Sequence, residues 1–264
     1  MKLSSLRSQG IIFLALLLNA SFLFAKHPSS LGVSEPSVPS RELQYENNSQ
    51  SRSLDKYFTQ TTFLDLFPTI DDLIITQIVG YPPIEESVEA LEDEAARAAA
   101  YDNATKEETW NAVRSEDSIF SYAYTLGSDF NAKNLPKTNA LFRKIDDDAR
   151  LAVHVAKYIF QRRRPLNSNG FAYPSGHSTR AFIWESLLSM AFPGEEAKLY
   201  NQAKVKAWNR VILGRHYPAD VEAGETYGIY LTQKFLENAS FKKEWAEVCQ
   251  EIQKKFPKQA LSGV

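Results

Sequence analysis

Apolar residues recur at the three- and four-residue spacing of amphipathic helices through most of the chain. The clearest cases are residues 85–101, acidic at their start and rich in alanine, and residues 141–163, whose apolar face includes Leu141 and Ile159. Further helices are expected over 105–113, 117–126, 178–191, 195–213, 219–238 and 242–256. No segment alternates apolar and polar residues as a half-buried strand does. The pattern predicts an all-α fold, a single-domain helical bundle over about residues 58–258.

Prolines and glycines mark where these helices stop. Pro165 is expected to end the long helix, because proline disfavours a helical conformation in the residue before it. A polar loop follows over 166–173, and Gly214 closes the helix over 195–213. Before the first long helix, residues 63–79 are expected to form an irregular segment and a short helix.

The N-terminal segment has a different character. Lys2 and Arg7 precede an apolar run over 11–24, and Ala25 follows it, as in a secretory signal peptide. The run is shorter than the roughly 20 residues that a membrane-spanning helix needs. We therefore expect cleavage of residues 1–25 and a periplasmic or secreted protein, the alternative being an uncleaved anchor in the inner membrane.

The remaining composition sets further limits. Residues 26–57 are rich in Ser, Pro, Asn and Glu and predict a flexible leader, and residues 259–264 form a short tail. No second apolar run is long enough to cross a membrane, so no integral membrane segment is expected after cleavage. The formal net charge of -2 gives no indication of nucleic-acid binding. Cys249 is the single cysteine, which excludes a disulfide within the chain and leaves it a structural role.

Three short clusters of residues could carry chemistry. The first contains Lys157 and Arg164, followed by Pro165. The two cations are seven residues apart, which is two helical turns, so they are expected on one helix face, where they could clamp a phosphate. A basic helix end is more often a solvated surface, and this is our interpretation of Arg162 and Arg163.

The second cluster, Pro174-Ser175-Gly176-His177, directly precedes a predicted helix. Glycine allows close approach of the backbone to a ligand, and the free N–H groups of a helix start bind anions. Ser175 can add a hydroxyl donor, and His177 would stand where it can protonate a leaving oxygen. The alternative is an N-cap serine followed by a surface histidine.

The third cluster runs from Asn209 and Arg210 to His216 and Asp220. A carboxylate at this spacing can hold one imidazole nitrogen as N–H and leave the other free as a nucleophile. Taken alone, such a pair could equally be a surface ion pair. Together, the three clusters supply three cations, an anion-binding turn and two histidines, as phosphoryl transfer through a covalent intermediate requires.

In order and spacing, the clusters resemble the signature K-x6-R-P, P-S-G-H and S-R-x5-H-x3-D of the phosphatidic acid phosphatase type 2 superfamily. Over about residues 80–258 the chain is most similar to the bacterial class A non-specific acid phosphatases. The resemblance implies the helical fold of acid phosphatases and vanadium haloperoxidases, and hydrolysis of phosphate monoesters. It implies no metal or other cofactor, and vanadate is expected to inhibit as a phosphate mimic.

The resemblance also implies roles for individual residues. Phosphate binding falls to Lys157, Arg164, Ser175, Gly176 and Arg210. His216 would form the phosphohistidine and Asp220 would hold it, while His177 would act as general acid and later activate water. The implied partners are small phosphate monoesters and no nucleic acid, and the chain could form a homo-oligomer.

Two departures from the signature bear on specificity. Asn209 replaces the family's serine, and the loop over 166–173, which borders the entrance in the family, is shorter than usual. Other functions therefore stay open beside the acid phosphatase. They are a lipid phosphate phosphatase acting at a membrane surface, a haloperoxidase, and a phosphate-binding protein without turnover.

Overall fold

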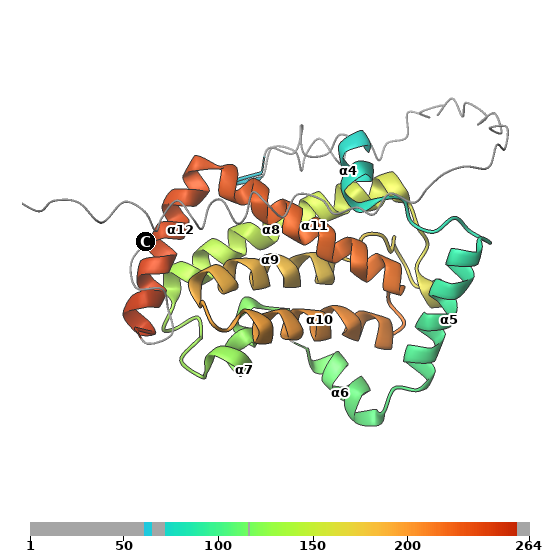
Figure 1. Ribbon diagram of the computed structural model, residues 1–264, viewed down its shortest axis with the longest axis horizontal. Helices are drawn as coiled ribbons and strands as arrows, with labels where there is room; N and C mark the ends of the chain where they lie inside the picture. Colours follow the sequence, from blue (N-terminus) through green and yellow to red (C-terminus); the bar gives the residue numbers. More distant parts are fainter. Residues whose placement is uncertain (1–60, 65–71, 116, 258–264) are drawn as a thin grey trace, which may run out of the picture. The chain divides into compact units, whose positions relative to one another are not determined.

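The computed structural model describes residues 61–64, 72–115 and 117–257, which form helices and the segments that connect them (Figure 1). The elements are α4 (Asp72–Val79), α5 (Val88–Asp102), α6 (Lys106–Arg114), the 3-10 turn η1 (Ile119–Tyr122), α7 (Ala123–Leu126), α8 (Pro136–Phe160), η2 (Pro165–Asn167), α9 (Gly176–Ala191), α10 (Glu196–Ile212), α11 (Pro218–Glu237) and α12 (Ala239–Lys255). Within these ranges no residue lies in a strand, apart from one bridge between Arg163 and Phe171. The predicted all-α fold is confirmed.

Some predictions concern other parts of the chain. The expected signal peptide (1–25), leader (26–57) and tail (259–264) lie outside the described residues. Among the helices that the structure does describe, none combines the length and the apolar character that a membrane crossing demands.

The centre of the bundle is α9, which lies between α10 and α11 in Figure 1 and packs against both. A helix surrounded by other helices needs small or apolar residues on every face. With the exception of Arg180, the buried residues of α9 meet this need: Ser178, Thr179, Ala181, Phe182, Ile183, Trp184, Leu187, Leu188 and Ala191. Because other helices pack against α9 on several sides, the position of its first turn is fixed.

Two glycines bring α11 unusually close to α9. A Cβ atom at Gly224 would lie 2.6 Å from the carbonyl oxygen of Ser175, and one at Gly228 would lie 2.5 Å from that of Thr179. No real Cβ tolerates such a distance from backbone, so only glycine allows this approach. The N–H of Ser175 also donates to the carbonyl of Asp220 at 2.8 Å. The first turns of the two helices are therefore joined.

We expect Gly228→Ala to lower the free energy of unfolding by about 1 to 3 kcal/mol, the usual cost of overpacking a core. The added methyl group meets the backbone of α9, which cannot rotate away as a side chain can. Urea unfolding followed by circular dichroism measures the change. Thr226→Ala, at an exposed position of the same helix, is the matched control. Equal stability of the two variants would contradict the close approach.

The long helix differs from the prediction at both ends. It starts at Pro136 and ends at Phe160, where Gln161 takes the left-handed conformation with φ 49. The chain after it forms an antiparallel bridge between Arg163 and Phe171, and the N–H of Ala172 donates to the carbonyl of Arg162. The expectation that Lys157 and Arg164 share a helix face is therefore wrong. Gln161 turns the chain before Pro165, so Arg164 approaches from a loop.

Candidate active site

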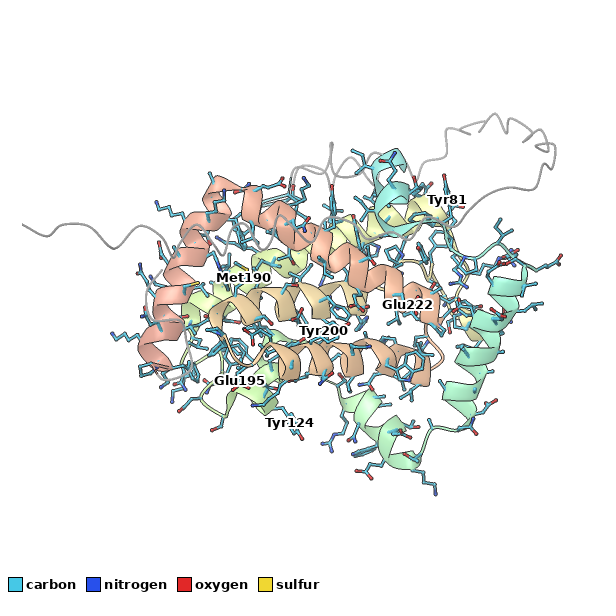
Figure 2. All side chains as sticks on the ribbon, viewed as in Figure 1. Tyr81, Tyr124, Met190, Glu195, Tyr200 and Glu222 are labelled. Carbon is cyan, nitrogen blue, oxygen red and sulfur yellow. The ribbon has the colours of Figure 1, made fainter. Side chains whose placement is uncertain are left out.

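The three sequence clusters meet at the first turn of α9. Lys157 comes from the last turn of α8, Arg164 from the loop after it, and Arg210 from the last turn of α10. The turn between α10 and α11 adds His216 and the first turn of α11 adds Asp220. Figure 2 labels Glu222, two residues beyond Asp220, and so marks this end of α11.

His216 and Asp220 form a buried pair. Nδ1 of His216 lies 3.2 Å from Oδ2 of Asp220, and their side chains are 1% and 0% exposed. The same carboxylate oxygen accepts the N–H of Tyr217 at 2.8 Å. Burial by itself would raise the pKa of Asp220, but its hydrogen bond to His216 and the nearby charges hold the pKa below its usual value. Asp220 therefore remains a carboxylate and keeps the proton of His216 on Nδ1.

The other ring nitrogen of His216 faces the cations. Its Nε2 lies 3.2 Å from Nη1 of Arg164, and this guanidinium can only donate. Burial lowers the pKa of His216 to about 4. Asp220 raises this pKa, whereas the charges of Lys157 and Arg164 lower it further. Above about pH 4 the ring is neutral, so Nε2 carries the lone pair that a nucleophile needs.

Two of the arginines predicted to bind phosphate each have a buried donor without a partner among the described residues. The Nε atoms of Arg164 and Arg210 are buried and find no hydrogen-bond acceptor in the described part of the chain. A buried donor left unpaired costs roughly 1 to 3 kcal/mol. Guanidinium groups bind oxyanions through such N–H groups. The two donors therefore point to an anion as the missing partner.

Lys157 holds the backbone of the segment that precedes α9. Its buried ammonium donates to the carbonyl oxygens of Phe171 at 2.8 Å and Ala172 at 2.6 Å. Burial and the charge of Arg164 lower its pKa to about 7. Lys157 thus fixes the segment that leads into the first turn of α9. Its predicted contact with phosphate stays a prediction.

The first turn of α9 provides further donors. Ser175 is the N-cap, and its hydroxyl accepts the N–H of Ser178 at 3.4 Å. The N–H groups of Gly176 and His177 lie in the first turn, where a helix has no carbonyl to offer them. A Cβ at Gly176 would lie 3.1 Å from Cγ1 of Val153, which shows how tightly this turn is packed. Ser175 is therefore an N-cap, as in the alternative interpretation, and anion binding by this turn stays a prediction.

His177 stands at the edge of the site, with 40% of its side chain exposed. Partial burial, followed by the charge of Arg210, lowers its pKa to about 3. A bound phosphate would offset that positive charge and so raise the pKa of His177. Oδ2 of Asp117 lies 3.6 Å from Nε2 of His177 and also accepts a hydrogen bond from Arg180.

Sequence reasoning missed a second layer of the site. Arg162 was expected on a solvated surface, but its side chain is only 10% exposed and bridges Asp93 and Asp220. Asp117, which faces His177, was not singled out either. No sequence spacing links Asp93 or Asp117 to the motifs, because they reach the site through the packing of α5 and of the segment after α6.

A small hollow, partly open to solvent, lies beside His177 and Arg210. The lining residues are Ala112, Ser115, Asp117, His177, Trp184, Lys206, Asn209 and Arg210. The loop over 166–173, expected at the entrance, contributes none of them. The Asn209 side chain makes no hydrogen bond to any residue that the structure describes. Its amide is therefore available to a ligand in this hollow.

Comparisons with known proteins find similar chains among phosphatases. The non-specific acid phosphatase of Salmonella typhimurium is 28% identical over 151 residues, which are 51% of this chain and 60% of that protein. The non-specific acid phosphatase of Providencia stuartii is 26% identical over the same shares. The lipid A 1-phosphatase of Porphyromonas gingivalis is 32% identical over 81 residues, 29% of this chain and 18% of that protein. The chain thus spans about 60% of the length of the acid phosphatases that it matches.

Among solved structures, the chain is similar to a transmembrane PAP2-type phosphatidylglycerolphosphate phosphatase from Bacillus subtilis. The TM-score is 0.43 at 22% sequence identity, with 65% of this chain and 94% of that one covered. Residues 148–240 match the sequence profile of the PAP2 superfamily, and this range holds all three clusters. This match and the similarity to acid phosphatases both support a relation to the PAP2 superfamily.

Proposed function

We propose that this protein is a phosphate monoester hydrolase of the non-specific acid phosphatase type, which works through a phosphohistidine on His216. One observation supports this most directly. The neutral Nε2 of His216 faces Arg164, and both Arg164 and Arg210 keep a buried N–H without a partner. A nucleophile beside unsatisfied cationic donors suits a phosphoryl group.

The first step forms the covalent intermediate. Arg164, Arg210 and the first turn of α9 bind the three equatorial oxygens, and Arg164 turns its Nη1 from the imidazole to the phosphate. Nε2 of His216 attacks phosphorus, and the bond from phosphorus to the ester oxygen breaks. His177 gives its proton to that oxygen, so an alcohol leaves. Asp220 accepts the hydrogen bond of Nδ1–H and stabilises the positive charge that the ring acquires.

The second step releases phosphate. His177, now neutral, takes a proton from a water molecule as that water attacks phosphorus. The bond between phosphorus and Nε2 breaks, so inorganic phosphate is released and both histidines return to their starting states. We propose that turnover needs no metal ion, because the cations of the chain supply the positive charge at the phosphoryl oxygens. We also propose export to the periplasm, on the signal pattern of residues 1–25.

Hydrolysis of p-nitrophenyl phosphate between pH 4 and 9 tests the proposal. We expect phosphate release that persists in EDTA and is inhibited by vanadate, which mimics the five-coordinate transition state. Thermal unfolding of the same sample verifies that the protein is folded. A folded protein that is inactive at every pH would refute the proposal, and loss of activity in EDTA would refute its metal-independent form.

A lipid phosphate phosphatase is the second candidate, favoured by the similarity to the lipid A 1-phosphatase. The same assay distinguishes the two when a soluble nucleotide monophosphate is compared with phosphatidic acid in detergent micelles. The acid phosphatase predicts a higher kcat/KM for the nucleotide. A large preference for the lipid would replace the first candidate with the second.

A further inference from the structure

A chain of three buried charges leads from α5 to the catalytic pair. Oδ2 of Asp93 accepts a hydrogen bond from Nη2 of Arg162 at 2.6 Å. Nη1 of the same guanidinium donates to Oδ1 of Asp220 at 2.8 Å. The exposed fraction of the side chain is 7% for Asp93, 10% for Arg162 and 0% for Asp220. Asp93 lies 69 residues before Arg162, and α5 stands beside the junction of α10 and α11 (Figure 1).

Arg162 has two opposite effects on Asp220. It fixes the orientation of the carboxylate, and the ring of Tyr217, 4.1 Å from the guanidinium carbon, holds Arg162 in place. As a cation in contact with Asp220, however, it weakens the attraction of that carboxylate for a positively charged His216 ring. Asp93 offsets the charge of Arg162, so the three groups together keep one net negative charge. Although burial opposes its charge, the pKa of Arg162 is raised by Asp220 and Asp93.

We propose that Asp93 is a positioning residue for catalysis, which acts through Arg162 to orient Asp220 and to preserve its negative charge toward His216. The inference rests on the proposed function, in which His216 becomes positively charged when it is phosphorylated. Asp93 itself is separated from the reacting atoms by Arg162 and Asp220. It should therefore govern the rate of the chemical step and leave substrate binding nearly unchanged.

The two oxygens of Asp93 have separable contacts. Oδ1 accepts the N–H of Ala219 at 2.9 Å and so caps the first turn of α11. Oδ2 contacts Arg162 alone among the described residues. Asp93→Asn keeps an oxygen for Ala219 while it removes the negative charge next to Arg162. A purely structural cap would survive this change, whereas a role through charge would not.

Steady-state kinetics of Asp93→Asn test the inference. We expect kcat to fall about 10- to 100-fold, the usual effect of removing a supporting group behind a reactive residue, with KM within about twofold of wild type. Glu92→Gln, an exposed position on the same helix, is the matched control and should retain wild-type kinetics. In an Arg162→Met background, Asp93→Asn should cost much less, because the route to Asp220 is already broken.

The pH profile separates this role from a loss of folded protein. The charged or titratable groups that face His216 are Asp220, Lys157, Arg164 and His177. Loss of the negative charge at Asp93 should lower the pKa of His216, so the acid limb of kcat/KM moves to lower pH. An unchanged limb, with kcat per folded molecule equal to wild type, would overturn the inference.

An NMR readout keeps the test independent of turnover. The Nδ1–H proton of His216, assigned by its loss in His216→Ala, should move upfield in Asp93→Asn because its hydrogen bond to Asp220 weakens. If wild type has no phosphatase activity but the resonance moves, the proposed function fails and the positioning by Asp93 stands. If wild type is active and neither the resonance nor kcat changes in Asp93→Asn, the positioning role is wrong and the proposed function stands.

Discussion

Replacing His216 by alanine is expected to reduce kcat by about 10⁴-fold or more, the loss that follows removal of a covalent nucleophile. The buried imidazole is held by Asp220 on one side and presents Nε2 to Arg164 on the other. Alanine offers no atom that can accept the phosphoryl group. Release of p-nitrophenol measures the rate, and a radioactive phosphoryl label that is stable in alkali and labile in acid identifies the intermediate in wild type.

His154→Ala is the matched control for this variant, because His154 is an exposed histidine of α8. It should keep wild-type activity and the phosphoryl label. The cations remain in the His216→Ala protein, so phosphate should still raise its melting temperature. Turnover that survives in His216→Ala would exclude His216 as the nucleophile and, with it, the proposed mechanism.

Replacing His177 by asparagine is expected to affect substrates according to their leaving groups. An alkyl phosphate such as glycerol phosphate releases a strongly basic alkoxide unless a proton is supplied, so kcat/KM should fall about 10²- to 10⁴-fold. p-Nitrophenolate is a weak base and leaves without a proton, so kcat/KM for p-nitrophenyl phosphate should fall far less. Both constants are measured with the same enzyme preparation. An equal loss for the two substrates would contradict the role of His177 as general acid.

The pH dependence of this step follows from the charges around His177. Arg210, Arg180 and His216 favour its neutral form, whereas Asp117 favours the protonated form. In the free site its pKa is lowered to about 3, mainly by burial. A bound phosphate raises that pKa, so His177 keeps its proton to higher pH in the complex. The alkaline limb of kcat is therefore expected at higher pH than that of kcat/KM.

Helix positions were the part of the fold that could be predicted best from the sequence, because apolar periodicity and helix-breaking residues act locally. The predicted helices over 178–191, 195–213 and 219–238 correspond to α9, α10 and α11. The pairing of His216 with Asp220 could be predicted equally well, since a spacing of four residues across a helix start brings the two side chains together. Residues 117–126 were less regular than predicted, as they form a 3-10 turn followed by α7.

The errors occurred where a contact depends on distant parts of the chain. Arg162 stands in a run of three arginines, which ordinarily indicates a solvated surface. Its burial depends on Asp93, a residue of another helix with no distinguishing neighbours in the sequence. Likewise, Lys157 and Arg164 have the spacing of one helix face, but Gln161 ends the helix between them.

By itself, the sequence determined the helical class of this protein and the set of residues that meet at the first turn of α9. Both depend on short-range spacing, on helix starts and stops, and on the chemistry of individual side chains. Only the tertiary structure decided how Arg164 approaches His216, which carbonyls hold Lys157, and that Asp93 supports Asp220 through Arg162. These contacts form only when helices distant in sequence pack together and exclude water, so no local pattern records them.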